Sequence, residues 1–184
     1  MRIPHHVVAS IVLALNLTFA WAAAPAKTTF PMRQGLHAYP VENGKLILVA
    51  GSYQDVTTFR RSYHFYFIPK GDETWNQVPL AHEPGELEFT ITSAGQGDET
   101  VSDGALVRLT DKIYFVRATK RPSKGAQHSA AIDATWFQFV EAPDNEPDGP
   151  PYSLKPVFTR TYADVEKMSV DSVLRTESAL KPGR

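Results

Sequence analysis

The 184-residue sequence has no cysteine and almost no net charge. Without cysteine the chain has neither disulfide cross-links nor a thiol nucleophile, so packing has to stabilise its fold. Its 19 Lys and Arg residues are matched by 20 Asp and Glu residues. Nucleic-acid binding and attachment to a membrane surface both favour a strongly basic chain. We therefore expect no nucleic-acid partner.

The only long hydrophobic run lies at the N-terminus, where Arg2 precedes an apolar stretch from Val7 to Phe19 and then the small residues of "AWAAAPA". A basic residue, an apolar segment and small residues in this order are typical of a secretory signal peptide. The run is shorter than the roughly 20 apolar residues that a membrane-spanning helix needs. The alternative is a retained membrane anchor or a buried helix, with which the absence of charged residues between Arg2 and Lys27 is also compatible.

We expect cleavage after Ala22, so that residues 1–22 form the signal peptide and residues 23–184 form one mature domain. The mature chain then has 184 minus 22, or 162, residues, which is enough for a single domain with a substantial core. Because the signal peptide contains one arginine and no acid, 18 basic and 20 acidic residues remain. We expect an exported protein without a stable membrane anchor, in the periplasm or, alternatively, secreted.

Short strand patterns separated by turn residues dominate the mature chain. Asn43-Gly44 before the apolar run 46–50 is typical of a hairpin turn, and Asp111-Lys112 joins two further apolar runs. Residues 87–92 alternate apolar and polar side chains. Other candidate strands are 63–68, 75–80, 131–142, in which Trp136 faces away from Phe137 and Phe139, and 152–158. The pattern predicts a mainly β fold, an antiparallel β-sandwich of about eight or nine strands.

Helical spacing appears only near the C-terminus. In residues 161–174 an imperfect apolar stripe is formed by Tyr162, Val165, Val173 and Leu174. This stripe predicts a short C-terminal helix that covers one end of the sheets. We expect the last residues, 176–184, to form a mobile tail.

The stretch "RRSYHFYFIP" carries bulky residues on both faces of one predicted strand. Tyr63, Phe65 and Phe67 point one way, while His64 and Tyr66 point the other. One face should therefore belong to the core and the other lie under a loop, a helix or a second subunit. We predict that His64 and Tyr66 lie at a packed or homodimer surface, with an aromatic ligand groove as the alternative.

Four basic residues follow one another around the end of another predicted strand. Arg117, Lys120, Arg121 and Lys124 lie in or next to "TKRPSKG". Together they could attract a carboxylate ligand or an acidic partner. The alternative is an ordinary solvated loop, because most charged loops have no ligand.

Residues for catalysis or metal binding do not form a recognisable pattern, so we expect neither catalytic residues nor a metal or cofactor. The segment "DNEPDG" resembles the start of a calcium loop, but its twelfth position is Lys155, which would repel the cation. Four histidines of the mature chain lack ligand spacing: His37, His64, His82 and His128. Asp98, Glu99 and Asp103 form either an acid–base group or a charged loop.

The order of several segments carries a family resemblance over roughly residues 41–174. These segments are "NGKLILVAGSYQD", "SYHFYF", "IYFVRATKRPSKG", "APDNEPDGPPYSLKPVF" and "TYADV". Their succession resembles the CarG-like family of carbapenem intrinsic-resistance proteins. The resemblance implies a periplasmic sandwich of two antiparallel sheets with short terminal helices, able to dimerise. It also implies protection against a β-lactam without destruction of the drug, and it assigns no functional residue.

A serine β-lactamase is not expected from this sequence. Such enzymes need a Ser-x-x-Lys at a helix start together with Ser-Asp-Asn and Lys-Thr-Gly elements. The one Ser-x-x-Lys of the mature chain is Ser178 to Lys181, and the other two elements are missing. The expected function is a non-enzymatic tolerance protein that binds a β-lactam or shields a cell-wall enzyme. The alternative is a periplasmic accessory or structural module, chaperone-like or inhibitor-like, that is unrelated to antibiotics.

Overall fold

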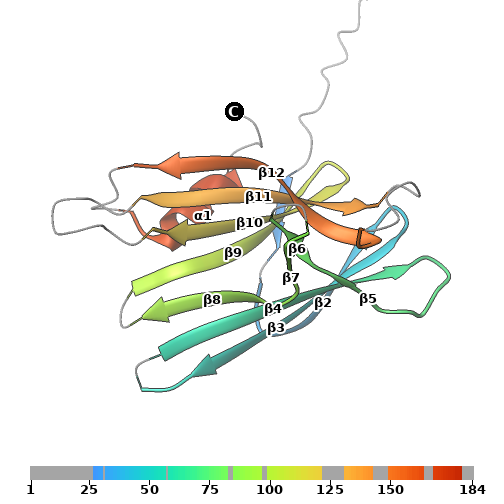
Figure 1. The fold of residues 1–184 in the computed structure, drawn as a ribbon, viewed down its shortest axis with the longest axis horizontal. Coiled ribbons are helices and arrows are strands. Elements are labelled where there is room, and N and C mark those ends of the chain that lie inside the picture. The colour runs from blue at the N-terminus through green and yellow to red at the C-terminus, as the bar shows by residue number, and fades with distance from the viewer. Residues whose placement is uncertain are drawn as a thin grey trace, which may run out of the picture.

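The computed structural model describes residues 27–30, 32–56, 58–82, 85–96, 99–121, 131–142, 149–163 and 168–179, which form a mainly β fold (Figure 1). The predicted signal peptide, residues 1–22, lies outside these ranges. The strands are β1 Lys27–Phe30, β2 Gly35–Val41, β3 Gly44–Gln54, β4 Thr58–Pro69, β5 Asn76–Val78, β6 Leu80–Ala81, β7 Leu87–Glu88, β8 Ile91–Gln96, β9 Glu99–Leu109, β10 Lys112–Lys120, β11 Ile132–Glu141 and β12 Tyr152–Tyr162, and the helix is α1 Val170–Ala179. No helix in the described ranges combines the length and the apolar character needed to cross a membrane.

The described strands join into one continuous mixed sheet. Its order is β2-β3-β4-β8-β9-β10-β11-β12-β6-β7, with β1 added to β9 and β5 added to β4. All pairs are antiparallel except β12 with β6. The mainly β class is confirmed, but the expected sandwich of eight or nine antiparallel strands is corrected to a single sheet of twelve. The reason is that β8 hydrogen-bonds to both β4 and β9 and so links the two halves.

The predicted hairpins are present at both turn sites. Val41 pairs with Gly44, so the first turn is formed by Glu42 and Asn43. Gly44 already belongs to β3, and a Cβ there would lie 2.2 Å from the Ile68 carbonyl oxygen. Glycine is therefore required at this position by close backbone approach.

Strands β9 and β10 form the second predicted hairpin. They pair from Leu109 and Lys112 outward, around a turn at Thr110 and Asp111. The predicted strand over 87–92 is interrupted, however. Strand β7 ends at Glu88, a bend follows, and Phe89 is 45% exposed before β8 begins.

The main core lies on the inner face of the bent sheet. The rings of Phe65 in β4 and Phe115 in β10 meet edge to face at 5.5 Å, although two strands separate β4 from β10 in the sheet. The rings of Phe67 and Phe139 of β11 meet in a tilted arrangement, with centroids 5.3 Å apart. With Tyr63, these residues confirm that one face of the aromatic strand belongs to the core.

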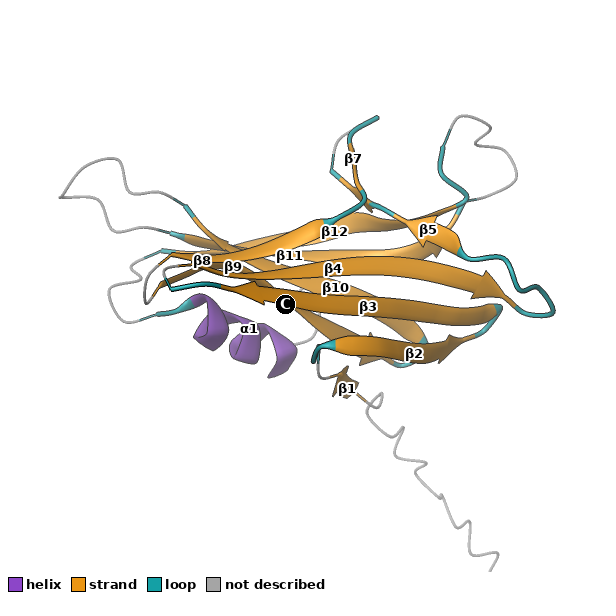
Figure 2. Ribbon diagram, turned by 90° about the horizontal axis from the view of Figure 1, so that it is seen from below, coloured by secondary structure: helices purple, strands orange, loops and turns teal. Residues whose placement is uncertain are grey.

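Helix α1 covers the other face of β9, β10 and β11 (Figure 2). Its Val170, Val173 and Leu174 are buried against a second cluster that includes Trp136. The predicted opposition of Trp136 and Phe137 is confirmed, because Phe137 belongs to the main core.

The ends of the helix differ from the prediction. Ser169 caps the start, since its Oγ accepts a hydrogen bond from the Ser172 amide at 3.1 Å. The helix then continues to Ala179, so residues 176–179 belong to it rather than to a mobile tail. Glu177 is buried there and holds these residues in place. Residues 180–184 and Val165 of the predicted stripe lie outside the described residues.

Candidate functional site

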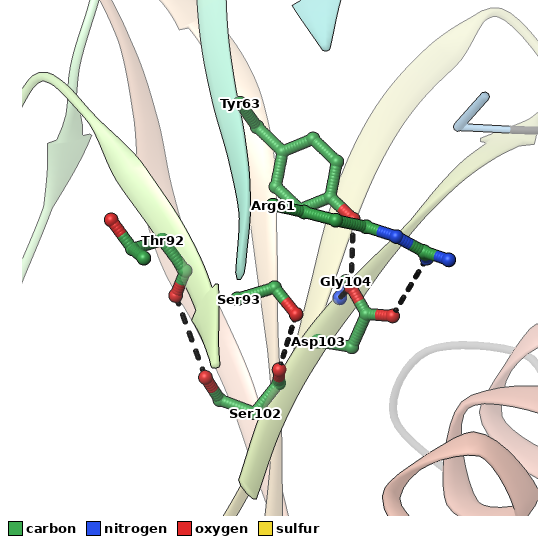
Figure 3. A network of polar contacts seen from close by, with 7 residues as sticks. All are labelled: Arg61, Tyr63, Thr92, Ser93, Ser102, Asp103 and Gly104. Carbon is green, nitrogen blue, oxygen red and sulfur yellow. Dashed lines mark hydrogen bonds and ion pairs between the residues drawn. The ribbon is translucent and has the colours of Figure 1, made fainter. Parts of the chain in front are cut away.

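A polar network joins β4, β8 and β9 (Figure 3). Asp103 is at its centre, with a residue exposure of 9%. Its Oδ1 accepts hydrogen bonds from the Tyr63 hydroxyl at 2.7 Å and the Gly104 amide at 2.8 Å, and its Oδ2 pairs with Arg61 Nη1 at 3.2 Å. Three donors from two strands thus satisfy one nearly buried carboxylate.

Two serines hold the strands on the other side of the network. Ser93 Oγ of β8 donates to the Ser102 carbonyl at 2.6 Å, and Ser102 Oγ donates to the Thr92 carbonyl at 3.4 Å. These bonds lie beside the register irregularity between Ala94 and Gly95. The side chains therefore supplement the backbone ladder where its regular pairing is disturbed.

Tyr63, Arg61 and Asp103 differ in charge and in exposure to solvent. Burial raises the pKa of Tyr63, and the charge of Asp103 raises it further. Burial tends to lower the pKa of Arg61, but its hydrogen bond to Tyr63 and the charge of Asp103 outweigh this and raise it. The Arg61 side chain is 42% exposed. A neutral phenol and a buried carboxylate therefore support a guanidinium that presents a permanent positive charge to solvent.

Arg61 lines two surface hollows of about 670 Å³ each. The first lies between β1, β9 and α1 and also contains Asp103, Asp171 and Arg175. The second lies between residues 32–34, β3 and β4. Its polar lining residues are Arg33, Gln34, Ser52, Gln54, Arg61 and Tyr63, and Phe59 lies among its apolar ones.

His64 and Tyr66 lie on the outer face of β4 and line neither of these hollows. Both are partly buried. The Tyr66 ring meets Trp75 edge to face at 5.6 Å, so the segment before β5 covers part of this face. A ligand or partner role for His64 and Tyr66 stays a prediction.

Two of the predicted basic residues, Arg117 and Arg121, pair with different carboxylates. Arg117 Nη1 pairs with Glu88 Oε2 at 2.7 Å, and the same oxygen contacts His82 Nε2 at 2.7 Å. Arg121 makes two bonds to Asp133, of 2.5 and 2.6 Å. Both arginines are thus paired within the chain.

The remaining basic residues do not complete a cluster in the described structure. Lys120 lies on the opposite face of β10 from Arg117 and Thr119, because successive side chains of a strand point to opposite faces. Lys124 lies outside the described residues. A ligand or partner role for this basic set stays a prediction.

Sequence reasoning did not identify Arg61 and Asp103 as neighbours. They are 42 residues apart and meet through β8, which the sequence pattern joined to residues 87–90 instead. The unusual "TTFRR" at the start of β4 was the available signal. Asp98, with which Asp103 was grouped, lies outside the described residues.

Other predicted groups of polar residues also lie outside the described ranges. They are Asp144, Glu146 and Asp148 of the calcium-like segment, and His128. In the ranges that are described, no three His, Cys, Asp or Glu residues lie close enough together to hold a metal ion.

Comparisons with known proteins support a likeness of fold. No protein-family model and no curated protein matches the chain. A solved structure, "Crystal structure of CarG", matches with a TM-score of 0.63 and 18% sequence identity, over 84% of this chain and 96% of CarG. The resemblance that the order of segments predicted is therefore confirmed, and the chain has the fold of CarG.

Proposed function

We propose that the protein is a non-enzymatic tolerance factor that protects a cell against carbapenem or related β-lactam antibiotics. It acts by binding the drug or by shielding a cell-wall target. The observation that carries this proposal is the likeness to CarG, which extends over 96% of the CarG chain and so includes its whole architecture. The proposed location is the periplasm, reached by means of the N-terminal signal peptide at residues 1–22.

Protection without catalysis is favoured by the chemistry of the polar network. Opening a β-lactam ring needs an activated nucleophile and a group that stabilises the developing oxyanion. The hydroxyls of Ser93 and Ser102 instead donate to backbone carbonyls. The network therefore supports the sheet and the Arg61 guanidinium, and the protein should act in proportion to its amount.

Two measurements test the proposal. Deletion of the gene should lower carbapenem tolerance, and expression of the mature protein in the periplasm should restore it in proportion to protein level. The purified protein should leave the ultraviolet absorbance of the carbapenem ring intact when the drug is in many-fold molar excess over the protein. Loss of the ring over many equivalents would mean that the protein is an enzyme.

An unchanged tolerance after deletion would instead favour the alternative of an accessory or structural module. A pull-down from periplasm with and without carbapenem separates the two modes of protection. A cell-wall enzyme captured in both samples indicates shielding, whereas drug bound without such a partner indicates sequestration.

A further inference from the structure

We propose that the hollow between residues 32–34, β3 and β4, here called the Arg33–Arg61 hollow, binds the carboxylate of a small organic acid. Its volume, about 670 Å³, lies within the range of small-molecule sites. Arg33 and Arg61 both line it, together with the amides of Gln34 and Gln54. None of the described residues that line it is acidic. The chemistry of this lining matches an anion that accepts several hydrogen bonds.

The charge balance at the hollow fits one carboxylate. Arg61 is already paired with Asp103, which lies behind it in the polar network. Two guanidinium groups and this one carboxylate leave a single positive charge, which one bound carboxylate would neutralise. In the neighbouring hollow, Asp103 and Asp171 balance Arg61 and Arg175. The Arg33–Arg61 hollow is therefore the one of the two that selects for an anion.

One of the two main donors, Arg61, is held in place before a ligand arrives. Arg61 is fixed by Asp103 at 3.2 Å and by the ring of Phe59, whose centroid lies 5.1 Å from the guanidinium carbon. Ser52 is the direct partner of Arg61 in the β3–β4 pairing. A preorganised site loses less conformational entropy when it binds.

Ser52 offers a further hydrogen-bond donor beside Arg61. Its Oγ accepts a hydrogen bond from Gln34 Nε2. Because a hydroxyl that accepts one bond still has its own hydrogen, Ser52 can donate to a carboxylate beside Arg61.

The hollow also offers apolar contact to the body of the ligand. Phe59, Met32 and Ala50 line it next to the arginines. A site of this kind favours a compact acid with an apolar part over a bare inorganic anion. The proposal deepens the proposed function and rests on it in one respect, since it identifies the antibiotic's carboxylate as the group that is recognised.

The test compares a carbapenem with its carboxyl methyl ester, by calorimetric titration into the mature protein. The free acid should bind, and the ester should bind about ten-fold more weakly because it lacks the charge that the arginines recognise. Arg33→Gln and Arg61→Gln should each weaken binding of the acid about ten-fold, and added salt should weaken it further. Arg60→Gln is the matched control, because Arg60 lies next to Arg61 on the opposite face of β4.

Failure of the proposed site and failure of the proposed function would give different results. Wild-type affinity in both Arg33→Gln and Arg61→Gln, equal binding of acid and ester, or no binding of the acid would each overturn the site. Circular dichroism shows whether Arg61→Gln is folded, and Arg33→Gln decides the matter if it is not. Tolerance of cells that express the same variants is measured separately. Binding without tolerance would contradict the proposed function alone, and tolerance without binding would contradict the site alone.

Discussion

Trp136 Nε1 donates a 2.7 Å hydrogen bond to Glu177 Oε2 and thereby joins the middle of β11 to the last turn of α1. The other oxygen of Glu177 accepts bonds from Arg160 Nη1 at 2.7 Å and from the Tyr162 hydroxyl at 2.5 Å. The Glu177 residue is fully buried. A carboxylate is stable at such a place only because several donors compensate for its lost hydration.

Replacement of this carboxylate should destabilise the whole domain. We expect Glu177→Gln to lower the free energy of unfolding by about 3 kcal/mol, because a neutral amide cannot form the charge-assisted bonds that the buried carboxylate accepts from Arg160, Tyr162 and Trp136. Urea unfolding followed by circular dichroism measures the change. Glu141→Gln, which alters an exposed carboxylate bonded to Asn43, is the control and should change stability by less than about 0.5 kcal/mol. Equal effects of the two variants would contradict the prediction.

Gly104 should tolerate no larger residue. A Cβ at this position would lie 2.4 Å from Cε2 of Phe115, in the centre of the main core. We expect Gly104→Ala to cost about 1–3 kcal/mol of unfolding free energy through overpacking. At Gly51, by contrast, a Cβ would meet only Ser62 Oγ at 3.4 Å. Gly51→Ala should therefore be far less harmful, and Phe115→Leu should partly rescue Gly104→Ala. Thermal unfolding of the variants measures these differences.

Tyr63 should make stability decline at alkaline pH. Burial, and then the charge of Asp103, raise its pKa in the folded state, whereas in the unfolded chain it has the ordinary value of about 10. A raised pKa stabilises the fold fully below about pH 10, and this contribution is lost as pH rises toward the folded pKa. Unfolding midpoints measured across this range should fall more steeply for the wild type than for Tyr63→Phe.

A matched variant shows whether the change in alkaline stability is specific to the buried Tyr63 hydroxyl or follows from the loss of any tyrosine hydroxyl. Tyr53 is 61% exposed, so Tyr53→Phe controls for removal of a hydroxyl at the surface. The prediction fails if the alkaline decline of Tyr63→Phe is as steep as that of the wild type.

The outer face of β4 can be tested at Tyr66. We expect Tyr66→Ala to lower stability or weaken self-association, because it removes the ring that meets Trp75. A loss of about 1–2 kcal/mol corresponds to a partly buried aromatic pair. Urea unfolding and gel filtration measure the two effects, with His64→Ala as a comparison on the same face. If both properties stayed intact while ligand binding alone disappeared, the aromatic groove would be the better interpretation.

Much of the fold could be predicted because long strands carry a strong alternating pattern. The strands β4, β10 and β11 were recognised from their apolar and aromatic residues, and the sides of Trp136 and Phe137 were correctly assigned. The short strands β6 and β7 have two residues each, too few for a period to appear. The continuity of the single sheet depends on β8, and its pairing with β4, from which β5, β6 and β7 separate it in the sequence, leaves no local signature.

The candidate site was harder to predict than the fold for the same reason. Basic residues that are close in sequence, such as Arg117 and Arg121, turn out to have separate acidic partners. Arg33 and Arg61 line one hollow because Arg33 lies just before β2 and Arg61 lies in β4, the two strands on either side of β3. Sequence shows which charges are adjacent along the chain, whereas tertiary pairing decides which of them are neutralised.

The pairing of β1 has a consequence for the order of events during folding. Lys27 at the start of β1 pairs with Leu109 of β9, and its Nζ donates to the Glu177 carbonyl of α1, 150 residues away. A chain made from its N-terminus presents β1 before the other described strands, but β1 cannot form its pairing with β9 until residues 106–109 exist, nor its bond to α1 until residue 177 has emerged. Contacts of such wide sequence separation form late. The earliest of the described strands to be made is therefore among the last to be locked into the native structure.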